Sequence, residues 1–289
     1  MAAGMIDTEL GQRLLRVADD QGLPLRDALL GSDDALRPTE IAQPALLFTE
    51  CVLMSGLDRS NVAAVSGHSL GEYAACVAAE ALTAEDAMQL VIARGRAMAA
   101  MQEGTMAAFI GLDAADVEAI CAEVRATHDE AVVVANVNAP GQTVISGSVH
   151  GVHAASELAR TRGVRRVVLL NVSGAFHSPL MTHAAAAFAS SLDAVELRGP
   201  VIPVVCNVDA HPARSADELR DRLRRQLTSP VQWIACIEAM LSMGVSTFVE
   251  VGPGSVLTGL ARRIAPDATA FAISRLEDPS RLSVEGASR

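Results

Sequence analysis

The sequence contains no lysine, so all 23 basic side chains other than histidine are arginines. This absence excludes a phosphate-binding loop that depends on lysine, and it excludes Schiff-base chemistry. The 34 acidic residues outnumber the arginines and leave a formal net charge of −11. A nucleic-acid surface needs a basic face, so we expect a small-molecule or carrier partner and no nucleic acid.

The sequence also lacks clustered cysteines and long apolar runs. Its five cysteines are far apart, form no C-x-x-C pair and predict buried thiols in a reducing compartment: Cys51, Cys76, Cys121, Cys206 and Cys236. Histidines and cysteines do not cluster at ligand spacing, so no metal site is expected. No apolar run reaches the roughly 20 residues of a membrane span, and no charged segment followed by an apolar core opens the chain. The sequence therefore predicts a cytoplasmic protein without a membrane anchor.

The most informative segment runs from Gly67 to Tyr73, Gly-His-Ser-Leu-Gly-Glu-Tyr. It follows an apolar stretch, Val62–Val65, that we interpret as a strand, and it opens an alanine-rich helix. A G-x-S-x-G element between a strand and a helix is typical of a nucleophile elbow, in which Ser69 would carry an acyl group. The competing interpretation is a glycine-flanked turn with an inert serine.

An elbow requires small residues where strand and helix approach closely, and Gly67 and Gly71 supply them. The turn also directs the backbone N–H of Leu70, at the helix N-terminus, toward the position of a tetrahedral oxyanion. The sequence therefore predicts half of an oxyanion hole at Leu70.

From about residue 105 the pattern changes, and the expected elements follow the order βαββαβ. Strands are expected at 106–112, 132–136, 143–146 and 166–172, and helices at 116–126 and 152–161. This order is the ferredoxin-like unit. We therefore predict an α/β hydrolase-like catalytic domain of residues 1–104 and 174–289, built on a parallel sheet, with a ferredoxin-like subdomain of residues 105–173 inserted in it. The active site is expected in the cleft between the two.

Several short motifs together give the chain a close resemblance to a known family. They are Gln43-Pro44-Ala45-Leu46, Gly67 to Tyr73, Arg94-Gly95-Arg96-Ala97-Met98, Asn138-Ala139-Pro140-Gly141-Gln142, Gly174-Ala175-Phe176-His177-Ser178, Asn207-Val208, Gln226-Leu227, Pro230-Val231-Gln232-Trp233 and Glu250-Val251-Gly252-Pro253-Gly254. In this order they resemble the malonyl-CoA:acyl carrier protein transacylases and the acyltransferase domains of polyketide synthases. The resemblance covers about residues 41–275. It implies malonyl transfer from malonyl-CoA to the phosphopantetheine thiol of an acyl carrier protein, in fatty-acid or polyketide synthesis, without a cofactor.

The resemblance also implies two catalytic residues. Ser69 would attack the thioester, and His177 would take its proton and later return one to the leaving thiol. In the family a main-chain carbonyl near the position of Gln226 holds this histidine. The residues alone leave Asp209 or Glu250 open as the orienting group.

The remaining site residues are implied as substrate-binding. Arg94 corresponds to the arginine that pairs with the malonyl carboxylate, a task that suits a planar, permanently charged guanidinium; the alternative is a surface arginine on a helix. Phe176 resembles the phenylalanine of malonyl-selecting polyketide acyltransferases, whose ring would fill the space of an α-methyl group; the alternative is a core aromatic. Leu70, Gln226, Gln43 and Asn138 complete the set.

The sequence departs from the family at its start. Family members begin with a strand and a Gly-Gln-Gly-Ser-Gln loop whose first glutamine donates the second oxyanion hydrogen bond, and this segment is absent before Gly4. Loss of one oxyanion donor typically costs about 2.7–4 kcal/mol of transition-state stabilisation. Three explanations compete: a start position downstream of the segment, which we favour, a donor supplied by Gln43 or Gln142, or a weakened enzyme.

Two other functions stay open at this level. An editing acyl hydrolase would use the same serine and histidine, although it has little need of a carboxylate-binding arginine. A weakened scaffold would bind carrier proteins without chemistry. Because carrier proteins are acidic, two arginine clusters are candidates for docking: Arg220, Arg222, Arg224 and Arg225 in one, Arg262 and Arg263 in the other.

Overall fold

The computed structural model describes residues 4–277, and the first part of this range is mostly helical. It contains α1 (Glu9–Asp20), α2 (Leu25–Leu30), the short 3₁₀ helix η1 (Asp33–Leu36) and α3 (Thr39–Met54). α1 begins where the Thr8 hydroxyl accepts a hydrogen bond from the Gly11 N–H. Within the described range, no helix is both long and apolar enough to cross a bilayer.

The strand predicted at Val62–Val65 is reduced to a single bridge. Only Val65 pairs with a neighbour, through a parallel bridge to Val204 in β5 (Val204–Val205). Extending this ladder one step toward the N-terminus would need a hydrogen bond from the N–H of residue 203, and Pro203 has no N–H. The predicted strand at 62–65 is therefore wrong in length, although this segment does lie beside β5.

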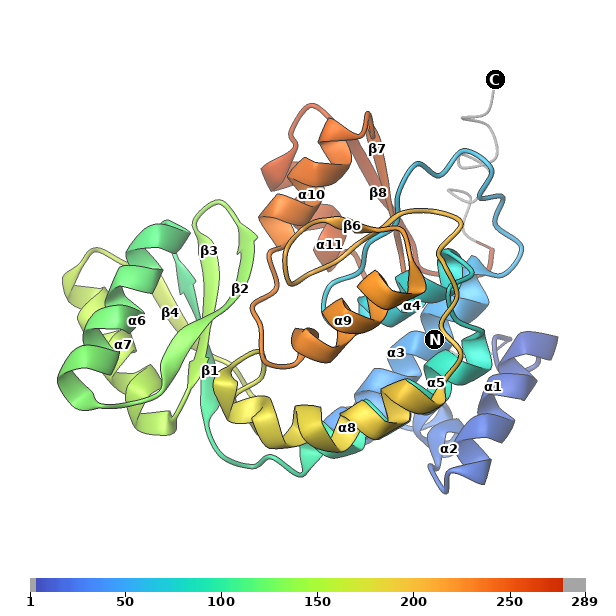
Figure 1. Ribbon diagram of the computed structural model, residues 1–289, viewed down its shortest axis with the longest axis horizontal. Coiled ribbons are helices and arrows are strands. Elements are labelled where there is room, and N and C mark those ends of the chain that lie inside the picture. Colours follow the sequence, from blue (N-terminus) through green and yellow to red (C-terminus); the bar gives the residue numbers. More distant parts are fainter. Residues whose placement is uncertain (1–3, 278–289) are drawn as a thin grey trace.

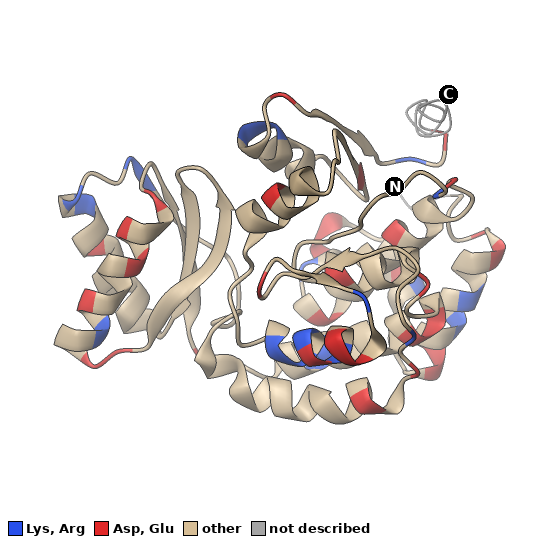
Figure 2. Ribbon diagram, turned by 45° about the horizontal axis from the view of Figure 1, so that its top comes forward, with Lys and Arg blue, Asp and Glu red and all other residues tan. Residues whose placement is uncertain are grey.

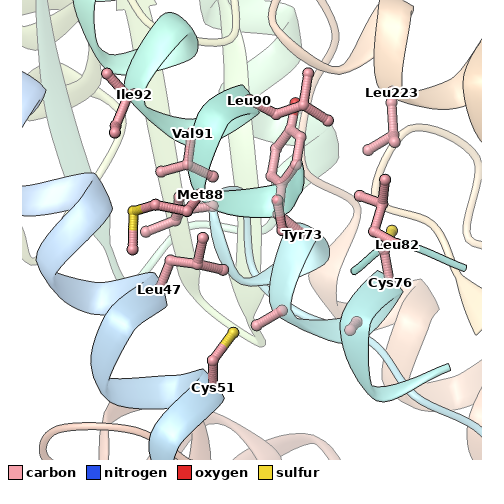
Figure 3. Packing of buried hydrophobic residues seen from close by; sticks show 14 of the residues in the cluster. Leu47, Cys51, Tyr73, Cys76, Leu82, Met88, Leu90, Val91, Ile92 and Leu223 are labelled. Atoms are coloured by element: carbon pink, nitrogen blue, oxygen red, sulfur yellow. The ribbon is translucent and has the colours of Figure 1, made fainter. Parts of the chain in front are cut away.

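Two helices follow and enclose the main core. α4 (Gly71–Ala78) starts directly after the turn at Ser69, and α5 (Ala84–Ala99) comes next. α3, α4 and α5 pack around a buried cluster that includes Leu47, Tyr73 and Met88 (Figure 3). This packing fixes the direction of α5 and thereby the position of Arg94 on it.

The inserted subdomain lies at one end of the molecule, at the left of Figure 1. Its elements are β1 (Thr105–Ile110), α6 (Ala114–His128), β2 (Val132–Ala139), β3 (Gln142–Gly147), α7 (Val149–Thr161) and β4 (Arg166–Leu169). The strands form an antiparallel sheet in the order β2-β3-β1-β4, and the two helices bury residues such as Ile120 and Ala155 against Phe109 and Ile145. This is the ferredoxin-like topology that the sequence predicted. The exact boundaries, 104/105 and 173/174, stay a prediction.

The chain then returns to the large body. It continues through η2 (Pro179–Met181), α8 (Thr182–Ala194), β5, β6 (Pro212–Ala213), α9 (Ala216–Gln226), α10 (Trp233–Ser242), β7 (Thr247–Val251), α11 (Val256–Ile264) and β8 (Thr269–Ile273). β7 and β8 pair in parallel along their whole length. The parallel sheet predicted for this body is thus present as the β7–β8 pair and the Val65–Val204 bridge. Residues 278–289, which the prediction assigned to this body, lie outside the described part of the chain.

Backbone pairing joins the two bodies. The Val231 N–H donates to the Ala135 carbonyl at 2.8 Å, and the Val137 N–H donates to the Val231 carbonyl at 2.9 Å, so β2 gains a short parallel partner in front of α10. The segment between α9 and α10 therefore contacts the inserted subdomain. Gln226, the last residue of α9, and Ser229 in this segment also contribute groups to the site.

Candidate active site

Ser69 lies on a strained turn between the Val65 bridge and α4. Its φ of 51° is in the left-handed region, which is uncommon for a residue other than glycine and is expected of a nucleophile elbow. Gly67 is needed there, because a Cβ at this position would lie 2.0 Å from the carbonyl carbon of Gly71. A Cβ on Gly71 itself would meet nothing within 4 Å. The prediction that both glycines make room is therefore wrong for Gly71, whose side-chain direction faces open space.

His177 approaches Ser69 from the segment before η2. Its Nε2 lies 2.7 Å from Ser69 Oγ, and its Nδ1 lies 3.0 Å from the Gln226 carbonyl oxygen and 3.2 Å from that of Ser229. A carbonyl only accepts, so Nδ1 carries the proton and Nε2 accepts the Ser69 hydroxyl proton. The histidine is thus oriented by main-chain carbonyls.

The two carboxylates left open by the sequence as orienting groups are engaged elsewhere. Asp209 pairs with Arg222 at 2.9 Å, and Glu250 accepts the N–H groups at the start of α11. Burial, followed by the positive charge of Arg94, lowers the pKa of His177 from 6.5 to about 3. The imidazole is therefore neutral at physiological pH, which is the form that a general base needs.

Arg94 is buried, with 1% of its surface exposed, so its interpretation as a surface arginine is wrong. Nη1 donates to Gln43 Oε1 at 2.5 Å, and Nη2 donates to Ser69 Oγ at 3.0 Å and to Gln226 Oε1 at 3.2 Å. None of the ion pairs found within residues 4–277 includes Arg94. A guanidinium desolvated in this way beside a hydroxyl is a site for an anion that a ligand brings.

Gln226, at the end of α9, ties these groups together. Its Nε2 donates to the Ser69 carbonyl at 2.9 Å and to Glu72 Oε2 at 2.8 Å, which leaves Oε1 to accept from Arg94. Burial raises the pKa of the Glu72 carboxyl, and the hydrogen bond from Gln226 opposes that shift. The side chain of Gln226 holds Arg94 beside Ser69, while its backbone orients His177.

Asn138 and Phe176 border the same centre. Asn138, near the end of β2, bonds through Oδ1 to His68 Nε2 at 2.8 Å, and the His68 ring centroid lies 5.4 Å from that of Trp233. Asn138 therefore contacts the residue beside the nucleophile rather than Ser69 itself. Phe176 is half-buried and packs against both the main core and a small cluster on the inserted sheet.

The backbone N–H of Leu70, the predicted oxyanion donor, differs from its neighbours in hydrogen bonding. The three N–H groups that follow it donate to the carbonyls of residues 68–70, and the Ser69 N–H donates to Asn207 Oδ1 at 2.7 Å. For the Leu70 N–H no such bond is found in the described part of the chain. The Leu70 N–H at the start of α4 is therefore available to a ligand.

The two glutamines considered as substitutes for the second oxyanion donor have other partners. The Gln43 amide donates to Thr39 Oγ1 at 2.9 Å and to Met98 Sδ at 3.3 Å. Gln142 bonds through its oxygen to Arg263 on α11. The Gln43 amide is therefore engaged away from the turn, and no contact found in residues 4–277 joins the Gln142 amide to the turn, so the structure gives no support to either as the donor.

Two buried residues of the centre, Glu72 and Asn207, have no role assigned from the sequence. Both belong to motifs that carry the family resemblance, so the sequence did mark them as candidates for the site. Residue type alone does not indicate that Asn207, which follows β5, reaches across to the backbone of Ser69.

A hydroxyl held between a neutral imidazole and a buried guanidinium, on a strained turn before a helix, defines a class of enzyme that forms an ester on serine and passes the acyl group on. Sequence comparison narrows this class, because the acyl transferase domain family matches residues 12–271. A malonyl CoA-acyl carrier protein transacylase of Bacillus subtilis (strain 168) is 38% identical over 280 residues, covering 94% of this chain and 87% of that protein. The chain belongs to the acyl transferase domain family.

Solved structures agree with this membership. An acyl-carrier-protein-S-malonyltransferase from Bartonella henselae superposes with a TM-score of 0.88 at 38% identity, covering 96% of this chain and 90% of that one. A malonyl-transacylase in complex with its type II polyketide synthase acyl-carrier protein superposes with a TM-score of 0.90 at 33% identity, covering 100% and 95%. The two-body fold is therefore that of the malonyl-transferring relatives.

Proposed function

We propose that this chain transfers a malonyl group from malonyl-CoA to the phosphopantetheine thiol of an acyl carrier protein, through an ester on Ser69. The observation that carries the proposal is the buried Arg94 guanidinium, 3.0 Å from Ser69 Oγ and without an ion pair in the described residues. The similar proteins are named for the same transfer, and one of them was solved with a carrier protein bound.

The closeness of Arg94 to Ser69 favours a short dicarboxylic acyl group. In a malonyl ester a single methylene separates the ester carbonyl from the free carboxylate, so the carboxylate falls beside a guanidinium that touches the serine oxygen. A planar guanidinium binds such a carboxylate with two parallel hydrogen bonds. An acetyl group would leave the buried charge unpaired, at a cost of several kcal/mol.

In the first half-reaction Ser69 Oγ attacks the thioester carbonyl of malonyl-CoA while its proton moves to His177 Nε2. The Leu70 N–H donates to the oxyanion that forms. Collapse of this intermediate breaks the carbon–sulfur bond, and His177 returns the proton to the departing thiolate of coenzyme A. The malonyl group is then an ester of Ser69, with its carboxylate on Arg94.

The second half-reaction runs the same steps in reverse with a new thiol. The phosphopantetheine thiol gives its proton to His177 and attacks the ester carbonyl. The intermediate collapses, the carbon–oxygen bond to Ser69 breaks, and His177 returns the proton to Oγ. The neutral imidazole is ready to accept a proton at the start of each half-reaction, because its pKa is low.

Of the two arginine clusters considered for docking an acidic carrier, the one on α11 fits better. On α9 each arginine pairs with an acid: Arg220 and Arg224 with Asp193, Arg222 with Asp209 and Arg225 with Asp221. Figure 2 shows the red and blue bands mixed along this helix. Arg263 on α11 instead bonds to the Pro140 carbonyl and the Gln142 amide. Arg263→Glu should slow transfer to the carrier protein without changing acylation by malonyl-CoA, and Arg224→Glu is the matched control.

We also propose that the protein acts in the cytoplasm. All five cysteines are buried and unbonded to one another, which suits a reducing compartment.

A transfer experiment tests the proposal against the editing hydrolase. Isolated malonyl-enzyme is mixed either with holo acyl carrier protein or with buffer, and the decay of the enzyme ester is followed. We expect the carrier to accelerate the decay strongly and to gain the malonyl group. Decay at the same rate in buffer, with free malonate as product, would instead indicate a hydrolase.

A further inference from the structure

Asn207 lies where β5 ends and reaches the turn that carries Ser69. The bridge between Val65 and Val204 places the two segments side by side, two residues before Gly67 on one and three before Asn207 on the other. Asn207 Oδ1 accepts the Ser69 N–H at 2.7 Å, and Nδ2 donates to the Gly67 carbonyl at 2.8 Å. One side chain therefore binds the backbone on both sides of residue 68.

The Asn207 amide has a single orientation. The Ser69 N–H needs an acceptor and the Gly67 carbonyl needs a donor, so oxygen and nitrogen cannot exchange places. Asn207 is also 0% exposed, its N–H donates to Glu72 Oε2 at 3.2 Å, and its carbonyl accepts the Gln232 N–H at 2.9 Å. The residue is anchored through its backbone as well as its side chain.

The turn needs such an anchor. Ser69 has a φ of 51°, and a non-glycine residue keeps a conformation of this kind only where its surroundings determine it. The two contacts of Ser69 Oγ, 2.7 Å to His177 Nε2 and 3.0 Å to Arg94 Nη2, depend on that conformation.

We propose that Asn207 is a positioning residue for the nucleophile: it holds the Ser69 backbone in the conformation that places Oγ between His177 and Arg94. This rests on the proposed role of Ser69 as the acylated residue. The hydrogen bonds of Asn207 go to the turn, to Glu72 and to Gln232, and none goes to Arg94. Its loss therefore slows the attack by Ser69 and leaves the binding of malonyl-CoA unchanged.

The test separates reactivity from binding. Reactivity is measured with a fluorophosphonate: Ser69 Oγ attacks phosphorus, fluoride leaves, and the hydroxyl proton passes to His177. A displacement of about 1 Å costs on the order of 100-fold in rate, so we expect Asn207→Ala to be labelled about 100-fold more slowly. Binding is measured by calorimetry with malonyl-CoA in a Ser69→Ala background. There the added Asn207→Ala change should leave the Kd within about twofold, because the arginine site is intact.

Thr258→Ala is the matched control. Thr258 is buried in the same body and its hydroxyl donates to Glu250 at 2.6 Å, so its loss destabilises the fold without touching the turn. We expect a lower Tm and an unchanged labelling rate. If Asn207→Ala does not fold, Asn207→Asp takes its place: it keeps the acceptor for Ser69 but opposes the Gly67 carbonyl with an oxygen, and it should be labelled at least about tenfold more slowly.

Labelling of a folded Asn207 variant near the wild-type rate would overturn the proposal, and so would a parallel loss of malonyl-CoA binding. The fluorophosphonate reaction needs no malonyl group. A wild-type protein that is labelled on Ser69 but is not acylated by malonyl-CoA would therefore contradict the proposed function, while the labelling of the Asn207 variants still decides the positioning role.

Discussion

Replacing Arg94 by methionine tests the origin of acyl-group selection. Methionine keeps an unbranched apolar stem and removes the charge. In the structure Arg94 is buried and donates to Gln43, Ser69 and Gln226, so the change leaves a site of uncharged groups where the carboxylate would bind. The fold around α5 stays packed by the same apolar neighbours.

The expected magnitude follows from the burial of this charge. Truncating one partner of a buried, hydrogen-bonded charge pair costs about 2–5 kcal/mol. At about 1.4 kcal/mol per factor of ten, kcat/KM for malonyl-CoA should fall by roughly 30- to 5,000-fold. An acetyl group carries no carboxylate for Arg94 to bind, so the rate of acylation by acetyl-CoA should fall much less. The ratio of malonyl to acetyl transfer is therefore the informative quantity.

The assay is a competition between malonyl-CoA and acetyl-CoA, with the enzyme ester identified by mass spectrometry. Arg96→Met is the matched control, because Arg96 lies on the exposed side of the same helix and bonds to the Gln21 carbonyl. It should leave the ratio unchanged. If Arg94→Met lowers transfer of both acyl groups equally, Arg94 supports Ser69 and does not select the carboxylate, and the reasoning is refuted.

Three further predictions concern single residues. Because the pKa of His177 is lowered to about 3, kcat/KM for acylation should stay level from about pH 8 to about pH 4 and fall below that as the imidazole is protonated; a midpoint near 6.5 in the pH–rate profile would contradict this. Phe176→Ser should raise methylmalonyl over malonyl transfer by about 5- to 150-fold, equivalent to roughly 1–3 kcal/mol, and an unchanged competition ratio would count against a role in selection. Burial, reinforced by the charge of Glu250, raises the pKa of Glu50 from 4.5 to about 8, so the folded state holds this proton more tightly and stability falls as the pH rises through that window. Glu50→Gln should therefore raise Tm more at about pH 8.5 than at about pH 5, and equal shifts in thermal melts would contradict the assignment.

The inserted subdomain could be predicted because each of its strands and helices is recognisable from a short stretch of sequence. Short apolar strands such as Val132–Ala139 alternate with helices, and a turn at Pro140 and Gly141 joins two of the strands. The order of these elements along the chain is enough to indicate the topology of the sheet. The large body was harder. Its parallel pairing at Val65 depends on a segment about 140 residues away, where Pro203 interrupts the ladder, and no local pattern contains that information.

The sequence predicted which residues form the site better than it predicted the contacts between them. The motif around Ser69 and the family resemblance indicated His177 and Arg94, and the structure brings both within hydrogen-bond distance of Ser69 Oγ. The burial of Arg94 depends on how α5 packs, and the sequence left it open. The link from Asn207 to the Ser69 N–H depends on the register between β5 and the turn, which side-chain chemistry does not encode.

The most direct test of the central claim is the mass of the intact protein after brief incubation with malonyl-CoA, for the wild type and for Ser69→Ala. The account predicts a malonyl increment on the wild type, released by holo acyl carrier protein, and none on Ser69→Ala. An increment on both proteins, or on neither, would contradict the assignment of Ser69 as the residue that carries the malonyl group.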